Sequence, residues 1–197
     1  MKNSRLLLAI FVTSMSPAPV LCAAQHTGTS ALVASPNSLD RVTREVRHEL
    51  VMQPFYGVFD DLSYAVNGSV VTLYGRVVAA ALKSGAENAV KQIEGVSKVD
   101  DQIRVLPPST MDDQIRRAEY RAIYSRPGLD IYAMQAVPSI HIIVEGGHVT
   151  LDGAVASQAN KTVAGIAANG VGGVFSVDNN LTVDSTKGDV QKPRPPK

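Results

Sequence analysis

An internal repeat constrains this chain more than any other feature of its sequence. The segment that begins at Val70 matches the segment that begins at His148, 78 residues later, and the match runs without a gap over 36 positions, of which 14 are identical. Unrelated segments rarely sustain such a match, so the repeat indicates one structural unit that is used twice. With only two copies in 197 residues, the chain is predicted to fold as a tandem pair of small domains.

The first part of each copy is typical of a β-hairpin. Residues 62–66 alternate apolar and polar side chains, as a half-buried strand does, and Asn67-Gly68 follows as a two-residue turn signal. The return strand carries Val71 and Leu73 on one face and ends at Gly75. The second copy repeats the strand, the turn, the return strand and the glycine at residues 140–144, 145–147, 149–151 and Gly153.

The second part of each copy changes to a helical period. Leu82, Ala86 and Val90 recur on one face of a helix, and Gly95 stands where a left-handed residue would cap the helix. The last strand is predicted at 99–105 in the first copy. The helical face, the glycine and the last strand of the second copy are at 164–171, Gly173 and 177–183.

A further helix is predicted before each hairpin, because apolar residues recur there at helical spacing. The apolar stripe of the first helix consists of Val42, Val46 and Leu50, and its candidate N-cap is Asn37 or Ser38. The apolar stripe of the second helix consists of Ile115, Ala118 and Ala122. Two carboxylates, Asp112 and Asp113, stand near its positive N-terminus.

The predicted order is therefore helix–strand–strand–helix–strand, twice. It predicts an α+β fold in which each domain has a three-stranded mixed sheet backed by two helices, with its last two strands parallel. The domains are predicted at 39–106 and 112–184, with a short Pro-containing linker at 107–111. The segments 25–38 and 185–197 are predicted to be disordered.

Residues 1–24 have the layout of a secretory signal peptide. Two basic residues precede a short apolar run, and small residues follow up to Ala24, after which cleavage is predicted. The apolar run is shorter than the roughly 20 residues that a membrane-spanning helix needs, although an anchor or a buried core helix is the alternative. Cys22 raises the further alternative of a lipoprotein, but the preceding Leu21 fits that motif poorly.

Cleavage would leave a nearly neutral chain without cysteine. The full sequence has 19 basic and 18 acidic residues, and loss of Lys2 and Arg5 changes the formal net charge from +1 to −1. Nothing in the overall charge predicts nucleic-acid binding, and any electrostatic binding must be local. Without a disulfide, the stability of the mature chain must come from packing.

The repeated residues resemble the BON domain. The first copy has VTLYGRV at Val71–Val77 and GVSKVDDQIRV at Gly95–Val105, and the second has VTLDGAV at Val149–Val155 and GVFSVDNNLTV at Gly173–Val183. The resemblance covers 39–106 and 112–184 and implies a non-enzymatic module of the bacterial envelope that is associated with osmotic-stress protection and phospholipid binding. Two copies behind an export signal is the arrangement of the family's periplasmic proteins.

The helix of the second copy carries the most informative surface. Arg117 and Arg121 are one turn apart, as are Tyr120 and Tyr124. Arginine binds phosphate in a forked geometry, and tyrosine suits a membrane–water interface. The plainer interpretation is a solvated basic face whose tyrosines cover the core of their own domain. The alternative is contact with anionic phospholipid headgroups, and it agrees with the resemblance, which implies a lipid contact through a helix of the second domain.

Three aromatic residues form a second candidate site. Phe55, Tyr56 and Phe59 lie just before the first predicted strand. We interpret these rings as a cover for the edge of the first domain's core. The alternative is a binding patch for a partner, such as the second domain.

The remaining candidates favour structural roles. His141 and His148 have no clear third ligand, Gly170–Gly173 is better explained as a helix cap than as an RNA-binding loop, and no metal site or cofactor is predicted. Adjacent carboxylates such as Asp60-Asp61 and Asp100-Asp101 point to opposite faces of a strand, so no shared acid–base site is expected. The glycines Gly75, Gly95, Gly153 and Gly173 specify the fold and not a function.

The sequence therefore predicts an exported, non-enzymatic envelope protein of the periplasm that contacts an anionic phospholipid membrane. An adaptor that binds other envelope proteins, without a lipid role, is the alternative.

Overall fold

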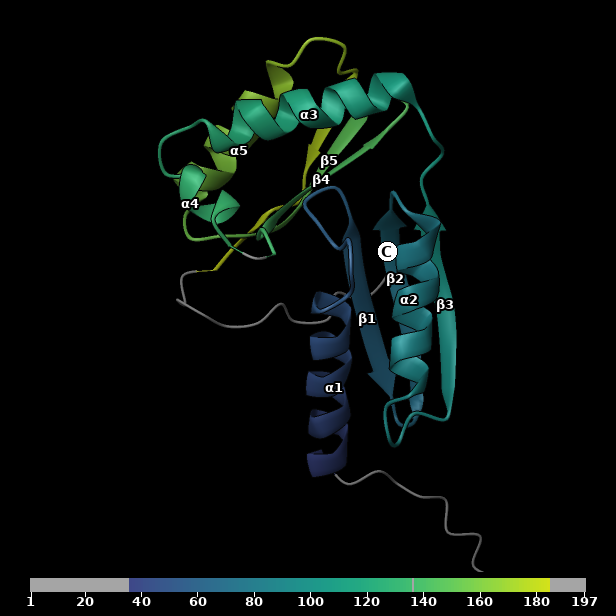
Figure 1. The fold of residues 1–197 in the computed structure, drawn as a ribbon. Coiled ribbons are helices and arrows are strands. Elements are labelled where there is room, and N and C mark those ends of the chain that lie inside the picture. Colours follow the sequence, from purple (N-terminus) through teal and green to yellow (C-terminus); the bar gives the residue numbers. More distant parts are fainter. Residues whose placement is uncertain (1–35, 136, 185–197) are drawn as a thin grey trace, which may run out of the picture. The chain divides into compact units, whose positions relative to one another are not determined.

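The computed structural model describes residues 36–135 and 137–184, so the predicted signal peptide with Cys22 and the segment 185–197 lie outside the described residues. The first domain contains α1 (Pro36–Val51), β1 (Asp61–Asn67), β2 (Val70–Val77), α2 (Ala80–Lys91) and β3 (Lys98–Val105) (Figure 1). The second domain contains α3 (Thr110–Tyr124), α4 (Asp130–Ala133), β4 (Ile140–Glu145), β5 (His148–Val155), α5 (Gln158–Asn169), β6 (Ser176–Asn179) and β7 (Thr182–Val183). The predicted α+β class is confirmed, and α4 is an additional element.

Each domain holds a mixed sheet. In the first domain β1 pairs antiparallel with β2, and β2 pairs parallel with β3. In the second, β4 pairs antiparallel with β5, and β5 pairs parallel with β6 and β7. The register is the same in both copies, since Val71 is the partner of Val99 and Val149 is the partner of Val177. The gapless sequence repeat therefore reflects a repeated pattern of strand pairing.

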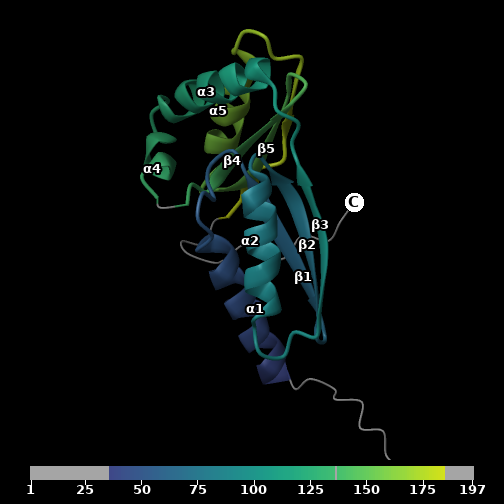
Figure 2. The same ribbon diagram turned by 45° about the vertical axis from the view of Figure 1, so that its right-hand side comes forward.

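The apolar periodicity explains how each core forms. In the first domain, α1 and α2 cover the same face of the sheet (Figure 2). The predicted stripe of α1 is buried, and it packs against alternate residues of β2, so the helical and strand periods meet in one apolar cluster. The central members of this cluster are Val42, Val46, Leu50, Val71, Leu73, Val77, Leu82, Ala86 and Val90.

The repeated glycine of the return strand is required by a close approach of two backbones. Gly75 has φ +132° and pairs with Leu62, and a Cβ atom at this position would overlap the carbonyl oxygen of Asp61. Gly153 has φ +125° and would overlap Ser139 in the same way. Both positions exclude a side chain sterically, in addition to the φ that disfavours L-residues. The glycine of the VTLxG pattern is therefore a requirement of the hairpin.

Several predicted turns and caps differ in position. Asn67 still pairs with Val70, so the two turn residues are Gly68 and Ser69, with positive φ at the glycine. Helix α1 begins at Pro36, so Asn37 and Ser38 lie inside its first turn, in a segment predicted to be disordered. Helices α2 and α5 end before the predicted glycines: their C-caps are Gln92 and Gly170, and Gly95 and Gly173 lie in the following turns with φ +94° and +90°.

The last strand of the second domain is interrupted. Pairing stops at Asn179 and resumes at Thr182, whereas a continuous strand was predicted at 177–183. The backbone N–H of Leu181 donates to the side-chain oxygen of Asn179 at 3.3 Å instead of continuing the ladder, and Leu181 is buried in the core. A side-chain oxygen that bonds the backbone two residues later competes with regular pairing.

Candidate functional site

Helix α3 has a polar buried face, which the apolar stripe did not predict. Ser109 caps the helix by accepting a hydrogen bond from the N–H of Asp112 at 3.2 Å. Asp112, Arg116 and Glu119 are all buried, together with Ile115 and Ile123. Of the predicted stripe only Ile115 is fully buried, whereas Ala118 and Ala122 are only half-buried. The buried face of α3 is therefore rotated relative to the prediction.

The free edge of β4 explains this rotation. Asp112 accepts hydrogen bonds from the N–H groups of Gly146 and Gly147, both at 2.9 Å, in the turn after β4. Arg116 donates to the carbonyl oxygen of Val144 at 2.7 Å, and the hydroxyl of Tyr124 donates to that of Ile140 at 2.8 Å. An edge strand presents backbone groups that need partners, and α3 supplies them with polar side chains.

The charge of Asp112 suits this position. Burial raises the pKa of its carboxyl, but the hydrogen bonds from Gly146, Gly147 and Ser109 and the nearby charge of Arg116 more than offset that effect. The pKa therefore lies below its ordinary value, and the carboxylate is held in its charged form. Arg116 is held by Asp113, at 2.6 Å, and by β4, so it is not available to an external anion.

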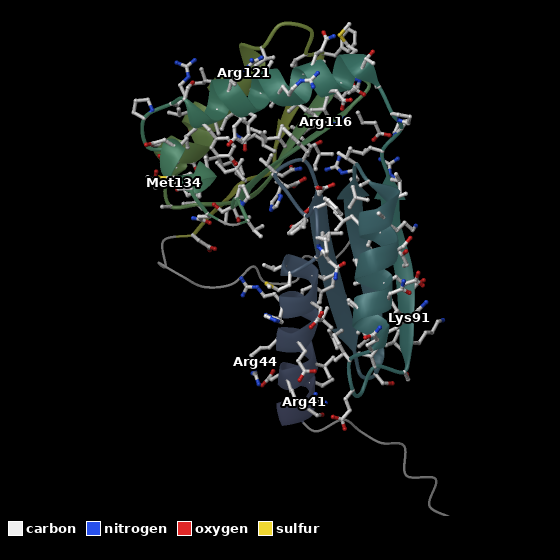
Figure 3. All side chains as sticks on the ribbon, in the orientation of Figure 1. Arg41, Arg44, Lys91, Arg116, Arg121 and Met134 are labelled. Carbon is white, nitrogen blue, oxygen red and sulfur yellow. The ribbon has the colours of Figure 1, made fainter. Side chains whose placement is uncertain are left out.

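The four residues predicted as a lipid-binding patch separate into two groups. Arg117, Tyr120 and Arg121 are exposed on the outward face of α3. Arg117 and Arg121 take part in none of the ion pairs among the described residues. Tyr124 is only 7% exposed, and its ring packs in the core of the second domain. Two arginines and one tyrosine of the predicted patch are thus exposed, and Tyr124 belongs to the core. Figure 3 labels Arg116 and Arg121 on this helix.

The aromatic residues before β1 also have different positions. Tyr56 packs against the core of the first domain and stacks on His141 with ring centroids 5.6 Å apart. Phe59 packs against the core of the second domain and meets Tyr120 edge-on at 6.4 Å. Phe55 is 83% exposed and has φ +70°. The interpretation as a cover for the first core is correct for Tyr56 and wrong for Phe55 and Phe59.

The segment that carries these rings also pairs with the edge of β4. The carbonyl oxygen of Val58 accepts a hydrogen bond from the N–H of Ile142 at 2.7 Å, between the two carbonyls that Arg116 and Tyr124 bind. Asp60 holds the segment by accepting from the N–H groups of Gly57 and Val78, at 3.2 and 2.8 Å. Burial raises the pKa of Asp60 despite these bonds.

An open pocket lies beside this segment and the start of α3. Its volume is about 460 Å³, and its apolar walls are formed by Phe55, Phe59, Val78 and Ala79. Its charged lining includes Asp60, Asp113, Arg116 and Arg117. Since Arg116 is bound by Asp113, Arg117 is the cation of this lining that has no ion-pair partner within the described part of the chain.

Glu119 is a buried group that was not among the predicted site residues. It has no exposed surface, and neither carboxylate oxygen has a hydrogen-bond partner among the described residues. Burial raises the pKa of this carboxyl to about 7. Its position four residues from both Ile115 and Ile123 was the available signal, because that spacing places it on their helical face.

The two histidines have separate surroundings. His141 is buried against Tyr56, whereas His148 is exposed and its Nδ1 lies 2.7 Å from the hydroxyl of Ser176. In residues 36–135 and 137–184, no group of three or more His, Cys, Asp or Glu side chains is arranged to hold a metal ion. In the same residues, no helix is both long and apolar enough to cross a bilayer.

Comparison with known proteins identifies the family. The model of the BON domain matches residues 38–107 and 112–185, which together make up most of the chain. The chain belongs to the BON domain family. A curated BON-like relative is osmotically-inducible protein Y of Escherichia coli, which is 32% identical over 196 residues that cover 92% of this chain and 96% of that protein. The resemblance of the repeat to the BON domain is thereby confirmed for both copies.

Two solved structures have a more distant likeness to this BON protein. Both are of CdsD, described as a structural protein of the type III secretion system of Chlamydia trachomatis, and both are 12% identical to this chain. One match covers 73% of this chain and 92% of the other, with a TM-score of 0.28. The other, to the C-terminal domain, covers 71% and 96%, with a TM-score of 0.26. At such scores the likeness supports no inference about function.

Proposed function

We propose that this BON protein is a non-enzymatic binding protein of the bacterial envelope, which contacts anionic phospholipid surfaces and supports tolerance of osmotic stress. The osmotic role is suggested by its 32% identity with osmotically-inducible protein Y. A periplasmic location is suggested by the signal peptide predicted at residues 1–24. The lipid contact rests on the outward face of α3.

The observation that carries the lipid contact is the difference in exposure between the arginines of α3. Arg116 is buried and bound by Asp113 and by the carbonyl of Val144. Arg117 and Arg121 are exposed, one turn apart, with no ion-pair partner in the described residues. Tyr120, one turn from Arg117 and next to Arg121 in the chain, is 37% exposed. Two exposed guanidinium groups with an amphipathic ring beside them on the helix suit a surface of phosphate groups above an apolar layer.

Vesicle co-sedimentation tests this proposal. The wild-type protein is expected to sediment with phosphatidylglycerol vesicles, to a lesser extent at high salt, and not with neutral phosphatidylcholine vesicles. The double variant Arg117→Glu/Arg121→Glu should bind at least about tenfold more weakly, because each basic residue near an anionic surface contributes roughly 1 kcal/mol. A matched control is Arg44→Glu/Lys98→Glu, which reverses two exposed charges in the first domain. Equal binding of the α3 variant and this control would refute the proposed site.

An adaptor function is the second candidate, and Phe55 is the observation that favours it. A large apolar ring that is 83% exposed, on a residue with the unfavourable φ of +70°, suits a contact that is completed by another molecule. If this function is correct, a photo-crosslinker at Phe55 should capture a defined envelope protein, and Phe55→Ser should abolish co-purification of that protein. Loss of vesicle binding by Phe55→Ser, without a captured protein, would instead assign Phe55 to the membrane.

A further inference from the structure

We propose that α4 is a membrane-inserting turn, which places Ile131 and Met134 below the phosphate groups of an anionic bilayer that α3 contacts. This inference rests on the proposed lipid contact and deepens it, because it names the apolar element that would enter the membrane. It concerns a segment that the first domain lacks.

The connection that contains α4 is longer than its counterpart. Nine residues, 52–60, join α1 to β1, whereas fifteen residues, 125–139, join α3 to β4. The strands that follow keep the same register in both copies, with Gly75 opposite Leu62 and Gly153 opposite Ile140. The hairpin therefore does not require the additional residues.

The inner side of α4 is firmly anchored. Leu129 and Tyr132 are buried in the core of the second domain. The hydroxyl of Tyr132 accepts hydrogen bonds from the N–H of Ala156 at 2.8 Å and from the side-chain amide of Asn160 at 3.0 Å. A buried ring whose hydroxyl accepts two hydrogen bonds fixes the position of the turn.

The outer side of α4 is apolar. Ile131 is 54% exposed and Met134 is 86% exposed. These residues are three positions apart, so they project from neighbouring places on one turn. Single exposed apolar residues are common on protein surfaces, but two of them on one anchored turn form a small patch that needs an explanation.

The charges around α4 favour an anionic bilayer as the occupant of this patch. Arg121 and Arg126 are exposed, and neither forms an ion pair with a described residue. The nearby acidic residue is Asp130, whose carboxylate accepts a hydrogen bond from the N–H of Gly128 at 3.0 Å. Figure 3 marks Arg121 on α3 and Met134 at the end of α4. Cations at the level of the phosphates with apolar side chains beneath them are the usual arrangement of an interfacial anchor.

A fluorescence experiment tests the insertion directly. An environment-sensitive fluorophore is attached at Met134→Cys in a chain that also carries Cys22→Ser, so that the new thiol is unique. With phosphatidylglycerol vesicles its emission should shift to the blue, and brominated acyl chains should quench it. The matched control is the same label at Ile166→Cys, on an exposed apolar position of α5, where neither change is expected. An unchanged signal at residue 134, while the protein sediments with the vesicles, would overturn the inference.

A second variant separates this inference from the proposed function. Ile131→Ser/Met134→Ser should reduce vesicle binding by about tenfold, because burial of only two CH₂ groups corresponds to that change in partitioning. Far-UV circular dichroism checks that the variant is folded. If wild type and this variant bind equally while Arg117→Glu/Arg121→Glu does not bind, only the insertion of α4 is wrong. If wild type does not bind anionic vesicles, both proposals fail.

Discussion

Glu119 offers a sharp test of the way α3 packs on β4. Its carboxyl is fully buried, its two oxygens have no partner in the described part of the chain, and burial raises its pKa from 4.5 to about 7. The reason is that transfer of an ionised group out of water is costly. The variant Glu119→Gln keeps the size of the side chain but does not ionise. We therefore expect it to be more stable than wild type at any pH where the carboxyl of the unfolded wild type is charged, which is above about 4.5.

The size and the sign of this effect follow from the pKa. Below pH 4.5 the carboxyl is protonated in both the folded and the unfolded chain, so it does not change stability with pH. Between pH 4.5 and about 7 the folded chain holds a proton that the unfolded chain has lost, so the free energy of unfolding falls as pH rises. The loss is complete above pH 7. At roughly 1.4 kcal/mol per pKa unit, it amounts to about 3 kcal/mol.

Urea unfolding at pH 4 and pH 8 measures this difference. Glu119→Gln and wild type should differ by less than about 0.5 kcal/mol at pH 4, and by about 3 kcal/mol at pH 8 in favour of the variant. Other titrating groups, such as Asp60 and Asp112, are present in both proteins, so their effects cancel in the comparison. Glu94→Gln, at an exposed position, is the control that should show no such gain. A difference that is the same at both pH values would refute the assignment of Glu119 as a buried carboxyl with a raised pKa.

Three further predictions concern the residues that hold the second domain and the repeated hairpin. In thermal unfolding, Gly75→Ala should lower the free energy of unfolding by more than about 2 kcal/mol, because the added methyl group overlaps the backbone of Asp61. Gly68→Ala is the control and should cost less, because its added methyl group meets no atom within 4 Å. Tyr124→Phe should cost about 1 kcal/mol in urea unfolding, through loss of one hydrogen bond, and should leave vesicle binding unchanged. Asp112→Ala should cost about 2 kcal/mol at pH 7. Since the pKa of this carboxyl is lowered, its charged form contributes stability that wild type should lose as the pH falls below 3.8, so the difference between the two proteins should become smaller there. Unfolding curves of Asp112→Ala and wild type that stay separated by the same amount at pH 2 would contradict this role.

The strands and the buried face of α1 could be predicted, because both depend on the residues within each segment. Alternation of side chains along β1 and β2 follows from the pleat, and the two glycines that end the return strands have no sterically allowed substitute. The stripe of Val42, Val46 and Leu50 was predicted correctly, because its side chains pack into an apolar cluster with β2 and α2. In such places a residue type and its spacing are sufficient to identify the buried face.

The face that α3 buries could not be predicted from apolar spacing. Its buried positions are chosen by the free edge of β4, which offers carbonyl oxygens and N–H groups instead of an apolar surface. Arg116 and Tyr124 are drawn inward for this reason, and Arg117 and Arg121 are left outside. The helix that carries the two exposed arginines was therefore predicted, but which of its side chains are exposed depended on a strand that follows the helix in the chain.

The sequence by itself determined the repeat and the order of the elements that the two copies share, because these depend on backbone sterics and on the side-chain period within each segment. Only the tertiary structure decided that Phe59 packs on the second core, that Glu119 is buried with no hydrogen-bond partner among residues 36–135 and 137–184, and that α4 presents Ile131 and Met134 to solvent. Each of these outcomes depends on surfaces that meet across distant parts of the chain. Burial depends on which surfaces pack together and not on the residue type alone.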